Sequence, residues 1–535
     1  MRLEQPPGMY EDARNLPGLI LSLAGVASTL LVLLVTSKFG IAYHSDSARY
    51  VSVSKSLLAG TGFTEYTGEP YVAGGPLYPA LLALGSILGS EPLITARYLH
   101  AGLFAVTIVM GGAWLWRLRP PLILWLLGLV LMITSAELMD LATNALTDML
   151  FAACIVYALT RLDAFLRDSK TRCLVLASIA ASLACLTRYI GITIVMSGVA
   201  LLLVASPSQR FRDRIREAGI FGLIASLPTG IWVFRNHLLS STPTGKRFAP
   251  FHTFIDFASS AIDVIGLWFL PTWAPPGARM LLGASILLSL CLGLVVAANQ
   301  ISERRRTRVG PFPDSTAILV AASFSIVYLV FLVVSGSRSF FSSSAARYTA
   351  PAVVPVVVVL IGLMSRLFAI EWRRRAPWWP GAGYVAVALL VIWPARYLVG
   401  RIVYAMREGA GGYASTKWTS SEVIRHLRAH PPRGAVFTNE PNALYFLGGV
   451  PSPRWIPANS TPYSPITSDE ALDQLRDSVM KYQGDMIVRF SALPPELATY
   501  HYSAADLQAA LPLKRLAAFP DGEIYLVKRS ELRDP

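Results

Sequence analysis

The chain has 535 residues, of which 53% are hydrophobic and only 15% are charged. Together with a mean hydropathy of +0.49, this composition excludes an ordinary soluble globular protein and predicts a polytopic membrane protein. The formal net charge of +14 does not indicate nucleic-acid binding, because the basic residues are spread over the loops between apolar segments.

About eleven segments are long enough and apolar enough to cross ~30 Å of hydrocarbon. They lie near residues 17–37, 93–116, 120–136, 147–163, 173–189, 190–205, 218–236, 279–299, 315–335, 348–370 and 378–400. The first segment is too long for the apolar core of a signal peptide, and no clear cleavage site follows it. We therefore expect an all-α membrane bundle of about eleven transmembrane helices.

Basic clusters occupy every second loop between these segments. They comprise Arg117 and Arg119; Arg161, Arg167, Lys170 and Arg172; Arg210, Arg212, Arg214 and Arg216; Arg304, Arg305, Arg306 and Arg308; and Arg373, Arg374 and Arg375. Since cytoplasmic loops are enriched in basic residues, this pattern predicts a plasma-membrane (inner-membrane) protein with a cytoplasmic amino terminus. An odd number of spans then places the carboxyl-terminal region outside the cytoplasm.

Two of the predicted outer loops, residues 38–92 and 237–278, are too long to be simple turns, which is typical of loops that form a site. In the first, Asp46, Arg49 and Tyr50 are spaced so that they share one face of an interfacial helix. A second helix is predicted over residues 77–88, which is too short to span the membrane.

The composition becomes that of a soluble protein from about Tyr404. Residues 435–438 and 485–490 are predicted strands, and residues 516–527 form a predicted hairpin. We therefore expect a transmembrane domain over residues 1–403 and a small extracytoplasmic α/β domain over residues 404–535. All four cysteines lie in or beside predicted spans, so the second domain is expected to fold without disulfides.

Asp46 has two interpretations. A carboxylate in the first turn of a helix is stabilised by the helix dipole by about 0.3–1 kcal/mol and needs no further role. However, helix capping requires neither Arg49 nor Tyr50. Near a lipid phosphate, a carboxylate can act as general base on an acceptor hydroxyl while guanidinium groups neutralise the leaving phosphate.

Other charged residues fall at the predicted outer ends of spans. Asp140 and Asp148 either face water or cap a helix, or they form a second acidic group that holds the acceptor or a metal ion. Arg188 and Arg347 stand against the positive-inside bias. They either snorkel or converge, with Arg97, in a phosphate clamp.

Several catalytic motifs are missing, including a Walker loop, His-Glu-x-x-His, Cys-x-x-Cys and a nucleophile elbow. An ATP-driven pump and a zinc protease are therefore disfavoured. The seven histidines show no ligand spacing, so no cofactor is predicted, and a divalent metal bound by carboxylates remains open.

The order of the short motifs is informative. Asp46-x-x-Arg49-Tyr50 is followed by Leu-Ala-Gly-Thr-Gly-Phe at residues 58–63, Pro-Leu-Tyr-Pro at 76–79, Arg97, Thr147-Asp148, Arg188-Tyr189 and Arg347-Tyr348-x-x-Pro351. Over residues 15–400 this order resembles the GT-C superfamily glycosyltransferases of the protein O-mannosyltransferase and aminoarabinose transferase type, families 39 and 83.

The resemblance implies a GT-C fold and transfer of a sugar from a polyprenyl-phosphate donor to an extracytoplasmic lipid, glycan or protein acceptor. Asp46 matches the family's catalytic acidic residue, Arg49 an arginine near the donor phosphate, Asp148 a second acidic residue and Arg188 a basic residue. The chain departs from the aminoarabinose transferases at Gly74-Gly75-Pro76, where they have Glu-Lys-Pro, so a lysine that would contact the phosphate is absent.

We therefore predict an integral membrane glycosyltransferase of the inverting kind with Asp46 as general base. Donor-phosphate binding is assigned to Arg49, Tyr50, Arg97, Arg188 and Arg347, and the acceptor or second acidic role to Asp148 and Asp140. Two other classes fit the same residues, namely a lipid-linked glycan flippase or ligase and a non-catalytic envelope scaffold. Many transporters have paired half-domains and broken helices, whereas this chain has long outer loops and a soluble tail.

Overall fold

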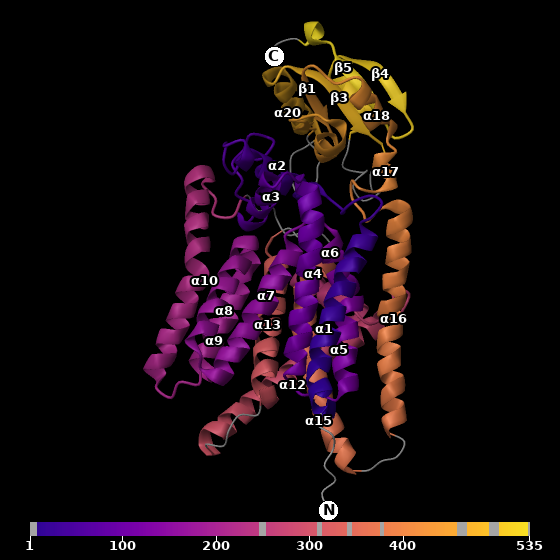
Figure 1. Cartoon of the computed structure of the whole chain (residues 1–535). Helices are drawn as coiled ribbons and strands as arrows, with labels where there is room; N and C mark the ends of the chain where they lie inside the picture. Colours follow the sequence, from indigo (N-terminus) through magenta and orange to yellow (C-terminus); the bar gives the residue numbers. More distant parts are fainter. Residues whose placement is uncertain are drawn as a thin grey trace, which may run out of the picture.

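The computed structural model describes residues 8–245, 253–307, 313–339, 345–374, 379–456, 468–491 and 502–532. In these ranges the chain forms a long helical bundle with a small sheet-containing domain stacked on one end (Figure 1). We call this end the domain-facing end of the bundle. The architecture confirms the predicted fold class, a polytopic helical membrane protein with a carboxyl-terminal α/β domain.

Each of the eleven predicted segments is helical. The bundle consists of α1 (Gly8–Val35), α4 (Pro92–Trp116), α5 (Leu122–Thr134), α7 (Asp148–Asp168), α8 (Thr171–Thr187), α9 (Ile192–Ala205), α10 (Phe211–Ser240), α12 (Pro276–Thr307), α13 (Pro313–Gly336), α15 (Val353–Arg374) and α16 (Trp379–Glu408). The predicted domain boundary after residue 403 falls inside α16.

The helices differ in length. Among the described residues, seven helices are long and apolar enough to cross a membrane, and the pair α5 and α6 (Ala136–Thr143), bent by 44°, makes an eighth if it is one span. The apolar helices α8 and α9 have 17 and 14 residues, fewer than the ~20 needed for a perpendicular crossing. They pack against α7 and α10, so they belong to the same bundle.

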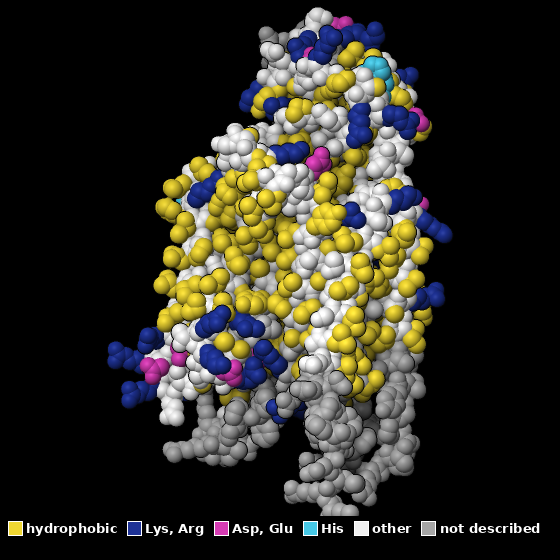
Figure 2. Space-filling view, viewed as in Figure 1, with side chains coloured by type: hydrophobic (Ala, Val, Ile, Leu, Met, Phe, Trp, Pro, Cys, Tyr) yellow, Lys and Arg dark blue, Asp and Glu magenta, His cyan; other side chains and the backbone are white. Residues whose placement is uncertain are grey.

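The outer surface of the bundle is apolar. Leu23 of α1, Ile231 of α10 and Leu288 of α12 are 60%, 63% and 70% exposed. Figure 2 shows a broad apolar band on one face of the bundle, with lysine and arginine gathered beyond it at the end opposite the sheet domain. Such a continuous apolar surface is unfavourable in water and is the expected contact with lipid.

Two short helices lie on the domain-facing end of the bundle, as predicted. They are α2 (Ser45–Leu58) and α3 (Leu77–Ile87) (Figure 1). The segment before α2 is held on both sides by backbone hydrogen bonds. The Ala145 amide donates to the Ala42 carbonyl at 2.7 Å, and the Tyr413 amide donates to the Tyr43 carbonyl at 2.9 Å. The start of α2 is therefore fixed between the bundle and the carboxyl-terminal domain.

The second predicted outer loop is described only in part. Its described residues contain the end of α10 and a helix, α11 (Phe254–Leu267). Between α13 and α15, the chain forms α14 (Ala345–Thr349) and a 3-10 turn, η2 (Ala350–Ala352), at the domain-facing end of the bundle.

The carboxyl-terminal domain is built on a five-stranded sheet of order β2-β1-β3-β5-β4. The strands are β1 (Ala435–Thr438), β2 (Arg454–Trp455), β3 (Gly484–Phe490), β4 (Leu513–Phe519) and β5 (Gly522–Val527). β1 is parallel to its two neighbours, and β5 is antiparallel to β3 and β4. The predicted hairpin is thus confirmed as β4 and β5.

Helices cover both faces of this sheet. Because side chains alternate along a strand, Val488 packs against α18 (Glu422–Ala429), while Ile487 packs against α20 (Ser468–Lys481) on the opposite face. The Lys55 ammonium lies 5.4 Å from the centroid of the Tyr445 ring, so this domain also contacts α2.

We predict the sidedness of the chain from the arginine pattern. In a variant without native cysteines, Gln508→Cys in the sheet domain should react with a membrane-impermeant maleimide on intact spheroplasts. Gln209→Cys, exposed in the arginine-rich loop before α10, should react only after permeabilisation, because basic loops remain in the cytoplasm. Labelling with the opposite preference would reverse the topology.

Candidate functional site

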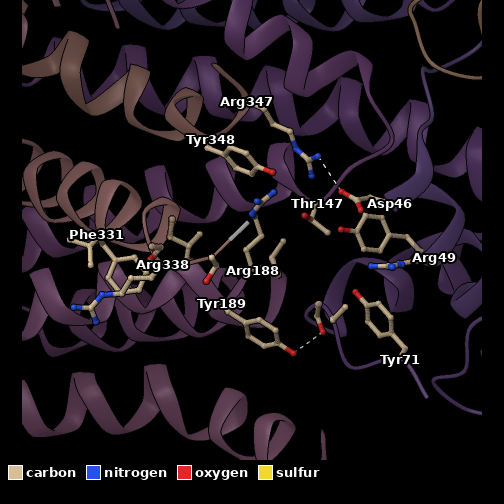
Figure 3. Close-up of a pocket in the computed structure, with 18 residues that line it drawn as sticks. Asp46, Arg49, Tyr71, Thr147, Arg188, Tyr189, Phe331, Arg338, Arg347 and Tyr348 are labelled. Atoms are coloured by element: carbon tan, nitrogen blue, oxygen red, sulfur yellow. Dashed lines mark hydrogen bonds and ion pairs between the residues drawn. The ribbon is translucent and has the colours of Figure 1, made fainter. Parts of the chain in front are cut away.

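A pocket of about 580 Å³ lies at the domain-facing end of the bundle, where α2, α13, α14 and the turn after α8 meet (Figure 3). Its charged lining consists of Asp46, Arg49, Arg188, Arg338 and Arg347, and its aromatic lining of Tyr50, Tyr71, Tyr189, Phe331 and Tyr348. One carboxylate and four guanidinium groups therefore face one cavity, which gives it an excess of positive charge.

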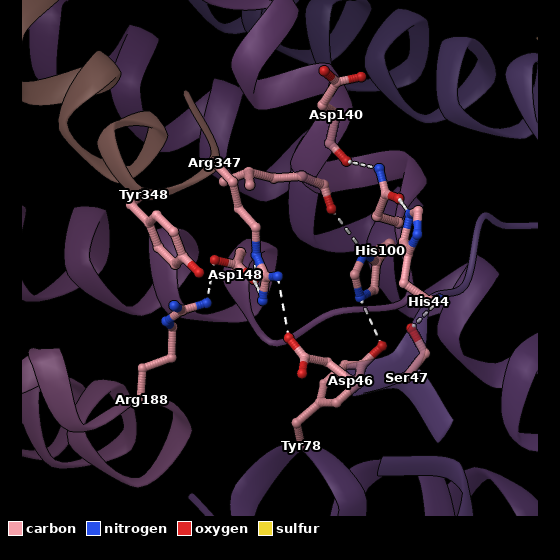
Figure 4. Close-up of polar contacts among 12 residues, drawn as sticks. His44, Asp46, Ser47, Tyr78, His100, Asp140, Asp148, Arg188, Arg347 and Tyr348 are labelled. Atoms are coloured by element: carbon pink, nitrogen blue, oxygen red, sulfur yellow. Dashed lines mark hydrogen bonds and ion pairs between the residues drawn. The ribbon is translucent and has the colours of Figure 1, made fainter. Parts of the chain in front are cut away.

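The polar centre of this site is a chain of ion pairs (Figure 4). One Arg347 nitrogen lies 3.2 Å from Asp46 Oδ2, and another lies 3.0 Å from Asp148 Oδ2. Arg188 donates to the other oxygen of Asp148. The order Asp46, Arg347, Asp148, Arg188 thus alternates negative and positive charges, and two carboxylates balance two guanidinium groups.

The two carboxylates differ in accessibility. The Asp148 side chain, at the start of α7, is only 1% exposed, whereas the Asp46 side chain is 42% exposed. Partial burial would raise the pKa of Asp46, but the positive charge of Arg347 and then that of Arg49 outweigh it and lower the pKa below the ordinary aspartate value. Asp46 is therefore the carboxylate that a substrate can reach, and it is held ionised.

A separate polar network fixes the chain just before Asp46. The His44 ring nitrogen Nε2 lies 2.7 Å from Asn144 Oδ1, and the Asn144 amide donates to the Asp140 carbonyl at 2.6 Å. The Asp140 carboxylate accepts from Arg401 of α16 at 3.1 Å. Asp140 does not line the pocket; its place in the structure is in this supporting network, which joins α6 to α16.

Arg49 and Tyr50 lie on the pocket side of α2, as their spacing predicts. Arg49 has a carboxylate partner, because its Nε lies 3.6 Å from Glu65 Oε2. The Tyr50 ring packs edge-on against Tyr71 and Tyr78, with centroid distances of 6.4 and 5.4 Å. These contacts orient the polar face of α2 toward the cavity.

Arg97 lies outside the pocket. Its Nε donates to Thr36 Oγ1 at 2.9 Å, and its Nη2 donates to the Leu33 carbonyl at 3.1 Å, so it joins α4 to the end of α1. Of the predicted phosphate-binding residues, the structure brings Arg49, Tyr50, Arg188 and Arg347 together and leaves Arg97 apart.

Sequence reasoning did not single out Arg338 and Tyr71. Arg338 follows α13 by two residues, at the predicted outer end of a span, so it stands against the positive-inside bias in the same way as Arg188 and Arg347. That signal was present in the sequence. Tyr71 offered none, because its position depends on the packing of the loop between α2 and α3.

Close packing explains why residues 74 and 75 are glycines. A Cβ at Gly75 would lie 1.9 Å from the Leu186 carbonyl oxygen, and one at Gly74 would lie 2.2 Å from the Tyr71 hydroxyl. The loop before α3 therefore approaches the turn that carries Arg188 too closely for any side chain at residue 75. This packing accounts for the absence of a lysine at this point of the chain.

The carboxylates near the cavity are paired with a guanidinium group. Within the described ranges, no three His, Cys, Asp or Glu side chains gather closely enough to form a metal site. The Asp46 and Asp148 carboxylates are bridged by the Arg347 guanidinium.

Comparisons with known proteins show the fold. ArnT from Cupriavidus metallidurans bound to undecaprenyl phosphate matches with a TM-score of 0.60 and 14% identity, covering 96% of this chain and 99% of that one. The arabinofuranosyltransferase AftD from Mycobacteria matches with a TM-score of 0.55 and 17% identity, covering 95% of this chain and 40% of AftD.

The Archaeoglobus fulgidus oligosaccharyltransferase, in complex with zinc and sulfate, gives a TM-score of 0.54 at 13% identity, covering 94% of this chain and 73% of that one. All three neighbours are GT-C superfamily glycosyltransferases. The chain has the GT-C fold. This confirms the resemblance inferred from the motif order, although no family model and no curated sequence matches the chain.

The ion-pair chain makes a prediction about stability. Asp148→Ala should destabilise the protein by about 3–5 kcal/mol, because it leaves Arg188 and Arg347 without their buried partner. Asp46→Ala should cost about 1 kcal/mol or less, because the Asp46 side chain is half-exposed and Arg347 keeps Asp148. Thermal unfolding of the purified variants in one detergent tests this order, and equal shifts would contradict it.

Proposed function

We propose that the chain is an integral membrane glycosyltransferase that transfers a sugar from a polyprenyl-phosphate donor to an acceptor outside the cytoplasm. The observation that carries the proposal is an accessible, ionised Asp46 carboxylate beside several guanidinium groups in one pocket at the end of a membrane bundle. A general base and a positively charged environment for a leaving phosphate are the two requirements of this reaction.

The proposed reaction is a single displacement. The acceptor hydroxyl attacks the anomeric carbon while the bond from that carbon to the phosphate oxygen breaks, and the polyprenyl phosphate leaves with the electron pair. Asp46 takes the proton of the hydroxyl. Asp46 is the one carboxylate that lines the described pocket, which supports base catalysis with inversion rather than a second carboxylate acting as nucleophile.

Arg347 couples the two halves of this reaction. Before transfer, its charge is shared between Asp46 and Asp148. Protonation of Asp46 removes one of these negative charges at the moment when the leaving phosphate gains one. The Arg347 guanidinium can then pair with the phosphate instead of Asp46, and the net charge of the pocket stays the same.

The structural neighbours support a lipid-linked donor. The ArnT structure contains undecaprenyl phosphate. The structure of the Archaeoglobus fulgidus oligosaccharyltransferase AglB, which matches this chain with a TM-score of 0.51, contains a dolichol-phosphate and an inhibitory peptide. We carry the lipid-phosphate class over to this chain as part of the proposal. The predicted inner-membrane location, with the pocket outside the cytoplasm, belongs to it as well.

Asp46→Asn should lower sugar transfer by about a hundredfold or more, because the amide keeps the size of the side chain but cannot accept the proton. We would measure lipid-linked sugars and envelope glycans by mass spectrometry in a strain that lacks the chain and carries each variant. The Asp46→Asn strain should accumulate the lipid-linked sugar as the deletion strain does.

Asp477→Asn is the matched control, because Asp477 is exposed on α20 in the sheet domain, and it should restore the wild-type profile. A flippase or a non-catalytic scaffold does not need a proton acceptor. Full restoration by Asp46→Asn would therefore favour those classes over a transferase.

A further inference from the structure

The cations of the pocket are not equivalent. Arg188 and Arg347 are neutralised by Asp148 and Asp46, and Arg49 lies within 4 Å of Glu65. Arg338 also lines the pocket, but it makes no ion pair or hydrogen bond through its side chain in the part of the chain that the structure describes. The excess positive charge of the cavity therefore resides at Arg338.

Apolar side chains line the pocket on the same segment as Arg338, next to Ser335 and Ser339. Phe331 and Val334 of α13 lie four to seven residues before Arg338, and Ile190 of the turn after α8 also lines the pocket. Figure 3 shows Arg338 and Phe331 on one side of the cavity, while Asp46, Arg49 and Tyr71 lie on the other, with Arg188 between them. The pocket is thus elongated, with one end that is cationic and apolar and another that is polar and carries the base.

α13 contributes both to the exposed apolar surface of the bundle and to the pocket lining. Val330, next to Phe331, is 57% exposed on a helix that is long and apolar enough to span the membrane. The ligand that suits an unpaired cation beside an apolar wall is a single negative charge attached to a hydrocarbon chain. A phosphodiester of a long isoprenoid alcohol has this chemistry.

We infer that Arg338 binds the phosphate of the lipid-linked donor, and that Phe331, Val334 and Ile190 contact its first isoprenoid units. The inference rests on the proposed function. It places the lipid phosphate of the donor at one end of the pocket and the sugar at the other. The sugar then lies toward Asp46 and Arg49, where the acceptor is deprotonated.

The test is equilibrium binding of undecaprenyl phosphate to the full-length protein in nanodiscs, with undecaprenol and inorganic phosphate as separate ligands. Arg338→Ala should raise the Kd for undecaprenyl phosphate by about tenfold to a hundredfold, because a hydrogen-bonded charge contact is lost. Arg338→Lys, which keeps the charge without the fork, should lie between wild type and Arg338→Ala. Arg338 is exposed, so neither variant removes a buried contact.

The control is Arg212→Ala, an exposed arginine at the opposite end of the bundle, which should bind as wild type does. Wild-type protein should prefer undecaprenyl phosphate to both undecaprenol and inorganic phosphate, since the site recognises charge and chain together. If wild type shows this preference and Arg338→Ala keeps it undiminished, the assignment of Arg338 is overturned while the proposed function stands. If wild type shows no such preference, the lipid-phosphate donor itself is overturned.

Discussion

The bridge that Arg347 forms between Asp46 and Asp148 organises the site. It joins residues that are 301 and 199 positions apart in the sequence, from the outer loop, from α7 and from α14. Asp148 is almost fully buried, and a buried carboxylate without a partner is strongly destabilising. The ion pairs therefore explain at once how an acidic residue is tolerated at the end of a membrane helix and why α2 lies over that end.

The carboxyl-terminal domain contributes to the same arrangement. It hydrogen-bonds to the backbone of Tyr43, three residues before Asp46. The Tyr66 hydroxyl donates to Asn442 at 3.0 Å, and the Tyr66 and Tyr445 rings stack at 4.5 Å. Since Tyr66 follows Glu65, the partner of Arg49, the domain contacts the outer loop on both sides of α2. We interpret it as a clamp that holds the base-bearing helix in place over the bundle.

Much of the fold could be predicted from the sequence because its signals are local. Hydrophobic length identified all eleven helical segments, and turn residues identified the hairpin of the small domain. The short spans α8 and α9 show the limit of this reasoning. Their joint apolar length resembles two crossings, but the turn at Arg188 leaves each below the usual span length.

The site was predictable only in part, because convergence is not a local property. Asp46, Arg188 and Arg347 could be selected as charges in unfavourable positions, but their contacts with one another depend on the packing of the bundle. Asp140 lies outside the pocket and pairs with Arg401, a residue 261 positions away in the sequence. Arg97 instead donates to the Thr36 hydroxyl and the Leu33 carbonyl at the end of α1, and a pattern of charges in the sequence does not identify such partners.

The proposed reaction requires a lipid phosphate in the pocket beside Asp46. A cryo-EM map of the full-length chain with bound undecaprenyl phosphate would show where the phosphate lies. We expect phosphate density between the Arg338 guanidinium and the Asp46–Arg347 pair, with the isoprenoid chain along α13 past Phe331. Phosphate density elsewhere on the bundle, with the Asp46 pocket free of lipid, would contradict it.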